Sequence, residues 1–279
     1  MAAPAAAPPR PTAGRATIPA RTLRHDRWWV QPTISAAVLL LFVGYATFAA
    51  FQNANYYVKP YISPFYSPCI ASICNHARAG AMHGIHVPNV GIIGTWWPIS
   101  PAILILVFPL GFRLTCYYYR RAYYRAFWQS PPGCAVGEPH KRYTGETRFP
   151  LIFQNVHRYF FYAGLVFNVI LTYDAVVAFV EPRSPAIGGG HVGLGSFVLV
   201  VNAALLWLYS ASCHSCRHIV GGRLKHFSKH PVRFWAWGVV SKLNRSHMQY
   251  AWASLIFVGL TDLYVRLAAS GWLGNGRWI

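Results

Sequence analysis

The stretch LGSFVLVVNAALLWLYSASCHSCRH, residues 194–218, joins a long apolar run to a dense group of metal-ligand side chains. Its first part, Leu194–Ser212, contains no charged residue. A helix needs about 20 apolar residues to cross the hydrocarbon core of a bilayer, so this run is predicted to span a membrane. The run leads directly into Cys213, Cys216 and two histidines, which places soft metal ligands at one membrane face.

Four further apolar runs have a similar length, and Pro109 is expected to kink the second of them. Only 11% of all residues are charged, against about a quarter in soluble domains. The sequence therefore predicts an all-α membrane protein, a bundle of about five transmembrane helices over residues 27–279. A Pro- and Ala-rich tail, residues 1–26, is expected to be disordered. The four further runs are Ser35–Phe51, Ile99–Tyr117, His157–Val180 and Met248–Leu267.

Basic residues are concentrated in alternate connections between these runs. The N-terminal tail, the second-to-third connection and the fourth-to-fifth connection are rich in Lys and Arg, and the last of these contains no acid. By the positive-inside rule these segments lie in the cytoplasm, so the N-terminus is predicted inside and the C-terminus outside. This topology, with contacts to anionic lipids, explains the formal charge of +19. The long uncharged runs argue against a nucleic-acid-binding protein.

Four of the predicted helices bring Cys or His to the same cytoplasmic face. Cys116 ends the second run, His157 begins the third, and His247 precedes the fifth, beside the Cys213–His218 stretch. Such mixed ligands hold structural zinc or a Rieske-type [2Fe–2S] cluster. His157 and His247 could instead ligate a haem b. Because spanning helices satisfy their own backbone hydrogen bonds and need no staple, a redox centre is favoured over structural zinc.

Four motifs follow one another along the chain: CYYYRRAYYRAFWQSPPGC (116–134), NVHRYFFY (155–162), CHSCRH (213–218) followed by IVGG, and HMQYAWASLIFVGLTDLYV (247–265). In this order and spacing they resemble the single-chain membrane anchor of actinobacterial succinate dehydrogenase, the respiratory complex II type with one large anchor subunit. The resemblance extends from about residue 27 to the end of the chain.

The resemblance implies an anchor, in the inner (plasma) membrane, for a flavoprotein subunit and an iron–sulfur subunit. It implies electron transfer to a quinone, of menaquinone or ubiquinone type, through a membrane-embedded Rieske-type [2Fe–2S] cluster. This chain would not oxidise succinate itself. Association of three such complexes stays open.

With that cofactor in mind, we expect Cys213 and Cys216 on one iron and His157 and His247 on the other. Cys116 and His218 are the leading substitutes. The spacing differs from that of soluble Rieske proteins, whose ligands alternate Cys and His in two loops.

Three alternatives remain at the level of the sequence. The first is a haem b anchor of the same complex, in which the two Cys of the CHSC stretch are incidental. The second is a metal transporter, which would need ligands along a path near mid-membrane. The third is a structural membrane protein whose helices are held together by a zinc ion.

Other residues are candidates for secondary roles. A quinone could be contacted by Arg113, Tyr117, Trp235 or Ser241, in the aromatic and basic segments near the inner interface. Asp174 and Asp262 lie within predicted spans, where ionisable residues are rare and usually functional; a proton path and a packing hydrogen bond to a neighbouring Tyr or Thr are the two readings. Cys69 and Cys74, on the outer side, are expected to form a disulfide.

Overall fold

The computed structural model describes residues 26–68, 70, 100–137, 139 and 151–273. Within these residues four helices are long and apolar enough to cross a membrane, or five if one sharply bent pair counts as a single span. This confirms an all-α membrane protein. The four helices are α1 (Val30–Gln52), α5 (His157–Val180), α6 (Leu194–Ala211) and α9 (His247–Ala269).

The bent pair corrects the prediction for the second span. The helix α3 (Ala102–Leu114) continues past Pro109 as helix, and the sharp break follows it, at Thr115 and Cys116. After the break, α4 (Tyr117–Tyr123) and a π-helix (Tyr124–Trp128) run at 81° to α3. The Tyr- and Arg-rich composition of this second part suits the membrane interface rather than the hydrocarbon core.

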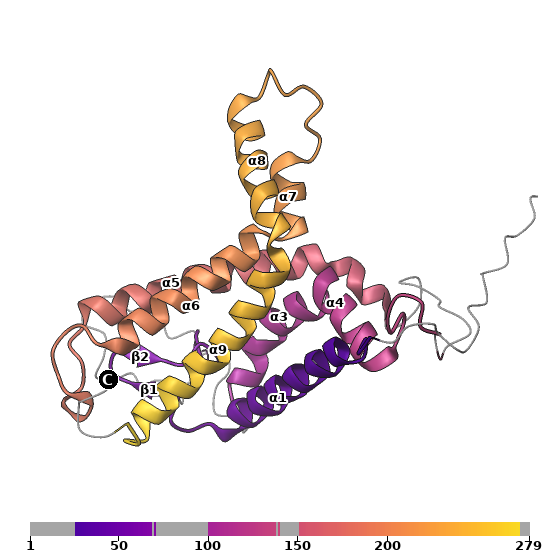
Figure 1. Cartoon of the computed structure of the whole chain (residues 1–279). Helices are drawn as coiled ribbons and strands as arrows, with labels where there is room; N and C mark the ends of the chain where they lie inside the picture. The colour runs from indigo at the N-terminus through magenta and orange to yellow at the C-terminus, as the bar shows by residue number, and fades with distance from the viewer. Residues whose placement is uncertain (1–25, 69, 71–99, 138, 140–150, 274–279) are drawn as a thin grey trace, which may run out of the picture.

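The bundle is built on α5, α6 and α9, which lie side by side (Figure 1). Small residues allow these helices to approach closely, as is common between membrane helices. At one end of the bundle Ala178, Ala203 and Val265 are buried together with Tyr61. Tyr61 comes from a short hairpin formed by β1 (Tyr57–Val58) and β2 (Tyr61–Ile62), and its ring lies against Gly195. The hairpin therefore closes this end of the bundle.

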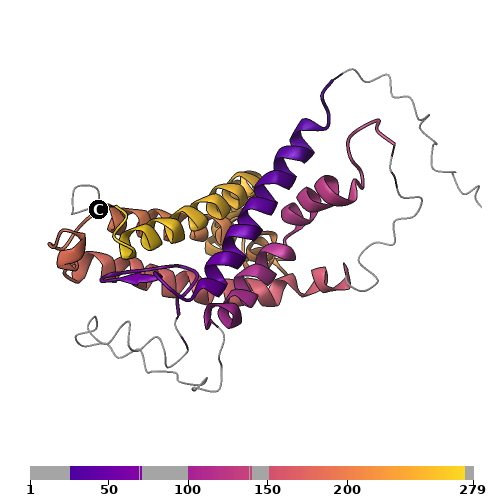
Figure 2. The same ribbon diagram turned by 90° about the horizontal axis from the view of Figure 1, so that it is seen from below.

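The opposite end of the bundle holds an aromatic core. Phe112, Phe161 and Tyr209 are buried there together with Cys116 and Cys213. Figure 2 shows α1 running obliquely along the bundle with α4 beside its N-terminal part. This end carries the metal-ligand residues, so the packing of α1, α3, α4, α5, α6 and α9 positions the candidate site.

Two further helices form a projection that the sequence analysis had treated as a basic loop. They are α7 (His214–Gly221) and α8 (Pro231–Arg245). Both stand out from the side of the bundle, across the direction of α5 and α6 (Figure 1). We call residues 213–246 the α7–α8 arm.

Candidate metal centre

Two cysteines and two histidines meet where four chain segments converge. Cys116 lies at the break between α3 and α4, where its extended backbone (φ −66°, ψ 132°) separates the two helices. His157 is the first residue of α5 and His247 the first of α9. Cys213 precedes α7 immediately after α6. Each ligand candidate therefore stands at a helix end, where the backbone has turned the side chain inward.

The contacts pair each imidazole with one thiol. The Nε2 atom of His157 lies 3.1 Å from the Sγ atom of Cys213. The Nε2 atom of His247 lies 3.5 Å from the Sγ atom of Cys116. Both imidazoles thus present the same nitrogen to sulfur, across sequence separations of 56 and 131 residues.

Two hydroxyl groups fix the tautomer of these imidazoles. The Thr115 hydroxyl donates to the carbonyl of Gly111 at 2.7 Å, and its oxygen lies 2.8 Å from Nδ1 of His157. Because a hydroxyl has a single proton, this oxygen accepts a hydrogen bond from Nδ1–H. The Ser212 hydroxyl donates to the Tyr209 carbonyl and accepts from Nδ1–H of His247 at 2.7 Å. Both Nε2 atoms therefore carry a lone pair toward sulfur, as a metal-binding imidazole requires.

Two pairs of adjacent residues, Thr115–Cys116 and Ser212–Cys213, each contact both imidazoles, one through the hydroxyl and the other through the thiol. The first pair contacts His157 through its hydroxyl and His247 through its thiol. The second pair contacts His247 through its hydroxyl and His157 through its thiol. Each imidazole therefore contacts one hydroxyl and one thiol, and these come from different pairs.

The site is enclosed by protein. Cys116, Cys213 and His247 are each no more than 2% exposed, and His157 is partly buried. Burial, followed by the neighbouring Cys116, raises the pKa of the Cys213 thiol to about 12. A metal bound there would have to displace the thiol proton.

A chain of ring contacts runs between the two imidazoles. The Phe112 ring stacks on His157, with ring centres 5.2 Å apart, and lies 5.0 Å from the Tyr209 ring. The Tyr209 ring stacks in turn on His247 at 5.2 Å. The guanidinium of Arg113 stands 4.8 Å over the outer side of this chain at Tyr209. The aromatic rings thus fill the space beside the thiols with apolar, polarisable groups.

The other two predicted ligands lie farther along α7. Cys216 is partly buried and packs against the same aromatic core, whereas His218 is exposed and lies beside Gly222. In the part of the chain that the structure describes, no three His, Cys, Asp or Glu side chains converge as ligands of a single metal ion. Cys116, His157, Cys213 and His247 instead form two contacting pairs, Cys116 with His247 and Cys213 with His157.

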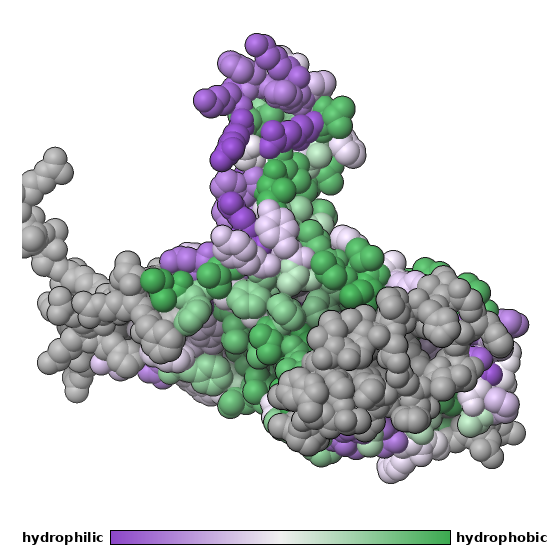
Figure 3. Space-filling view, turned by 180° about the vertical axis from the view of Figure 1, so that it is seen from behind, coloured by the Kyte–Doolittle hydropathy of each residue, from purple (hydrophilic) through white to green (hydrophobic). Residues whose placement is uncertain are grey.

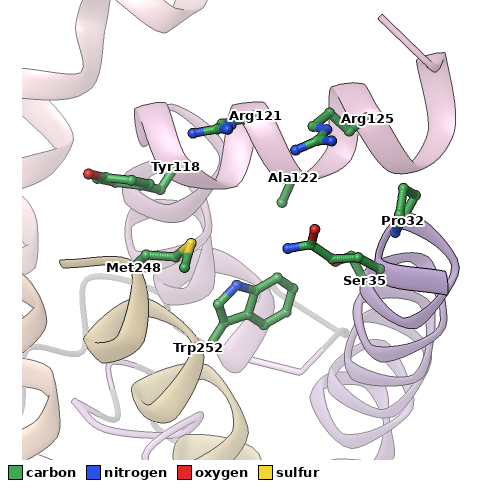
Figure 4. A pocket seen from close by; sticks show the side chains of 9 residues that line it. Pro32, Ser35, Tyr118, Arg121, Ala122, Arg125, Met248 and Trp252 are labelled. Atoms are coloured by element: carbon green, nitrogen blue, oxygen red, sulfur yellow. The ribbon is translucent and has the colours of Figure 1, made fainter. Parts of the chain in front are cut away.

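A cavity of about 260 Å³ opens next to His247. The Tyr118 ring forms part of its wall and lies 5.2 Å from the imidazole of His247. Figure 4 shows Tyr118, Arg121 and Arg125 on one side and Met248 and Trp252 on the other. The N-terminal turns of α1 complete the wall with Gln31, Pro32 and Ser35.

One polar group in the wall of this cavity is unsatisfied. The Nε atom of Arg125 is buried and has no hydrogen-bond partner among the described residues. Arg125 belongs to the π-helix Tyr124–Trp128, and π-helical turns occur frequently at functional sites. A buried donor of this kind is costly unless a ligand acceptor completes it.

The four predicted quinone contacts lie elsewhere. The Arg113 guanidinium is inside the bundle, where it donates to the hydroxyls of Tyr119 (2.6 Å) and Ser254 (3.2 Å). Tyr117 is exposed under the guanidinium of Arg120. Trp235 and Ser241 belong to α8, where the Ser241 hydroxyl accepts a hydrogen bond from Arg217. None of the four lines the cavity.

The two membrane acids are both buried at the end of the bundle that holds the hairpin. Asp262 forms an ion pair of 2.7 Å with Arg266 and accepts hydrogen bonds from Tyr45 and Ser63. Asp174 accepts a hydrogen bond from Ser67. The partners of Asp262 differ from the neighbouring Tyr and Thr residues that the sequence indicated. Cys69, Cys74 and the N-terminal tail lie outside the described residues.

Sequence reasoning missed Thr115, Ser212 and Arg125. The signal for the first two was present, since a hydroxyl residue directly precedes a cysteine at two predicted helix ends. Arg125 had no such signal, because several arginines occur in the same segment and two of them, Arg121 and Arg125, line the cavity.

Comparisons with known proteins agree on one family. The family described as "Actinobacterial succinate dehydrogenase subunit SdhC" matches residues 30–271. A chain in the structure titled "Mycobacterium smegmatis Sdh1 complex in the apo form" is similar, with 52% sequence identity and a TM-score of 0.78. That match covers 93% of this chain and 94% of the other. No protein with a curated description matches.

Proposed function

This chain belongs to the actinobacterial succinate dehydrogenase SdhC family, and on that premise we propose that it relays electrons from its partner subunits to a quinone. It is a multi-pass membrane subunit of the succinate dehydrogenase complex. The relay would use a Rieske-type [2Fe–2S] cluster held by Cys116, His157, Cys213 and His247. We assign succinate oxidation to a flavoprotein subunit, joined through an iron–sulfur subunit at the inner face of the cell membrane.

The donor set carries this proposal. A Rieske-type cluster needs two Cys and two His, and two of each meet here with both Nε2 lone pairs facing sulfur. A Rieske-type centre places both Cys on one iron and both His on the other, whereas the contacts join each His to one Cys. The identity of the four ligands, rather than their pairing, therefore supports the cluster. When bound, the cluster would supply one-electron transfer at a potential above that of an all-Cys centre.

The same geometry argues against haem b. Each Nε2 atom, which would have to bind the haem iron, already contacts a thiol. The Phe112 and Tyr209 rings connect the two imidazoles, along the route that a haem between them would occupy. The ligands also meet at one end of the bundle rather than along a path through it, which argues against a metal transporter.

We propose that the quinone head group binds in the cavity next to His247. The Tyr118 ring contacts both the cavity and the imidazole, so a quinone there would be separated from the metal centre by a single side chain. Arg125 would donate a hydrogen bond to a quinone carbonyl and so orient the ring. Met248 and Trp252 would provide an apolar wall for the ring faces.

The test compares two cysteines in the intact complex. We would purify the complex with Cys116→Ser or Cys216→Ser, reduce it with dithionite, and record its EPR spectrum and its iron content. We expect the Rieske-type signal, with its low average g value, to be lost with Cys116→Ser and kept with Cys216→Ser. Serine is nearly isosteric, so the matched substitution separates loss of a ligand from loss of packing.

Two outcomes would contradict the proposal. Loss of the signal with Cys216→Ser alone would mean that Cys216, and not Cys116, is the second Cys ligand, as the sequence analysis expects. A bis-imidazole haem spectrum in the unsubstituted complex, without a Rieske-type signal, would establish the haem b anchor instead.

A further inference from the structure

Side-chain contacts hold the two helices of the α7–α8 arm together. The Arg217 Nε atom donates to the Ser241 hydroxyl at 3.1 Å, and its guanidinium stands 5.3 Å over the Trp237 ring. Arg233 reaches back from α8 and donates to the carbonyls of Val220 and Gly222, each at 2.5 Å. Since these contacts join the two helices directly, the arm presents defined faces.

One face of α8 is apolar and has no partner in the described residues. Val232 is 77% exposed and Trp235 is 69% exposed, and Val239 follows one turn later. The spacing of these residues places them on one side of a helix, while Arg233, Trp237 and Ser241 face α7. The structure buries no residue of α8. We call the set Val232, Trp235, Ala236, Val239 and Leu243 the apolar face of α8.

The arm joins the bundle where α6 ends and α9 begins. It projects across the direction of α5 and α6, two of the four candidate spans (Figure 1). It leaves the bundle at the end that the Lys and Arg distribution places in the cytoplasm. In Figure 3 the hydrophobic surface of the arm continues down into the hydrophobic surface of the bundle. This continuity is what an apolar face in the same lipid layer requires.

The charge of the arm complements an anionic surface. Residues 213–246 contain seven Lys and Arg residues and no Asp or Glu. Figure 3 shows hydrophilic and hydrophobic surface on opposite sides of the arm. The exposed basic residues are Arg223, Lys225, Lys229, Arg233, Lys242 and Arg245.

We propose that the α7–α8 arm lies in the cytoplasmic interface of the bilayer, with the apolar face of α8 among the acyl chains and its basic residues on the phosphates of anionic phospholipids. An amphipathic helix with Trp on one face and Lys or Arg beside it binds membranes in this way. The long basic side chains can reach the head groups while their stems stay apolar. This inference does not depend on the proposed electron relay.

A protein occupant fits this face less well. A water-soluble partner subunit would meet the hydrophilic side of the arm. The hydrophobic side instead continues into the hydrophobic surface of the bundle (Figure 3). Lipid is the partner that surrounds this hydrophobic surface whether or not other subunits are bound.

The first experiment identifies what touches Trp235. Position 235 of the chain, in the intact complex in its native membrane, would carry the photo-crosslinking residue p-benzoylphenylalanine. The same residue at His218, which is exposed on α7, is the matched control. After irradiation we expect peptides carrying a phospholipid adduct from position 235 and none from position 218. A crosslink from position 235 to another subunit, or to a second copy of this chain, would overturn the proposal.

The second experiment tests the charge without altering the apolar face. The purified complex would be placed in nanodiscs of phosphatidylcholine alone, or of phosphatidylcholine with phosphatidylglycerol, and amide hydrogen exchange in residues 232–243 measured. We expect exchange at least about tenfold slower in the anionic nanodiscs. Lys225→Glu with Lys229→Glu should abolish this difference, and Lys225→Arg with Lys229→Arg should keep it. Equal exchange in both nanodiscs for the unsubstituted complex would contradict the electrostatic contact.

Discussion

The hydroxyls of Thr115 and Ser212 hold both imidazoles in the tautomer that can bind metal. Outer partners of this kind typically change metal affinity or activity by about 10–100-fold. We therefore predict that Thr115→Val with Ser212→Ala lowers the iron content of the purified complex and shifts the reduction potential of its metal centre. Iron analysis and a redox titration followed by EPR measure both effects. Ser241→Ala, which removes a hydroxyl in the arm, is the control; equal iron and an unchanged potential in both variants would exclude this role.

Arg125 gives a second prediction for a single side chain. A hydrogen bond from a charged group is worth about 1.5–3 kcal/mol, so Arg125→Leu should raise the KM for quinone by about tenfold or more. Succinate oxidation with a soluble artificial electron acceptor should stay unchanged. Arg158→Leu, at an exposed arginine that does not line the cavity, should leave both activities intact. A parallel loss of both activities in Arg125→Leu would indicate a fault in assembly instead.

For individual residues, the sequence indicated that Cys and His would form the site, but not which of the several Cys and His residues would lie in contact. Of the predicted ligands, His157 and Cys213 are in contact with each other, whereas His247 contacts Cys116. Cys116 stood only as a substitute, because its inward direction depends on the break after α3. Cys216 looked favourable from the Cys-x-x-Cys spacing, yet α7 begins between the two thiols and carries Cys216 around its own axis.

Among the elements, α3 is held against α5 by a glycine. A Cβ atom at Gly111 would overlap the Phe160 ring of α5, whereas one at Gly44 of α1 would meet no atom within 4 Å. Overpacking of this kind typically costs about 1–3 kcal/mol. We predict that Gly111→Ala lowers the melting temperature of the purified complex and decreases its iron content, because Cys116 follows α3 directly. Gly44→Ala should leave the melting temperature unchanged or raise it slightly; the same loss in both variants would contradict the packing argument.

The lengths of the elements could be predicted where apolar runs end at clear boundaries. The third span was predicted as His157–Val180 and is observed with those bounds, and the fourth ends at Ala211 instead of Ser212. The bend in the second span was expected at Pro109 and not at Thr115 and Cys116, because proline is a stronger sequence signal for a bend than an ordinary Thr–Cys pair. The break there depends on the Thr115 hydroxyl bonding the Gly111 carbonyl and on contacts of Tyr119 and Arg113 with α9.

In the molecule as a whole, one buried ion pair ties the N-terminal and C-terminal spans together. Arg266 of α9 binds Asp262 and also donates to Gln52 and to the carbonyls of Ala49 and Ala54, around the end of α1. Removing one partner of a buried pair costs about 3–5 kcal/mol. Arg266→Met should therefore lower the melting temperature strongly.

The double variant Asp262→Asn with Arg266→Met sharpens this prediction. It leaves no uncompensated carboxylate, so it should melt above Arg266→Met alone, although below the unsubstituted protein. Arg158→Met controls for the loss of a positive charge at an exposed site. A double variant that is less stable than Arg266→Met would show that Asp262 is stabilised chiefly by Tyr45 and Ser63.

The wide separation of the ligands along the chain determines the order of events during biosynthesis. Cys116 and His247 are 131 residues apart, and translation proceeds at about 5–20 residues per second. For several seconds, on that estimate, the ribosome has released the first thiol but not the last imidazole. Under the proposed function, the full set of cluster ligands would exist only once α9 has been made, and the cell would have to keep the cysteines reduced until then.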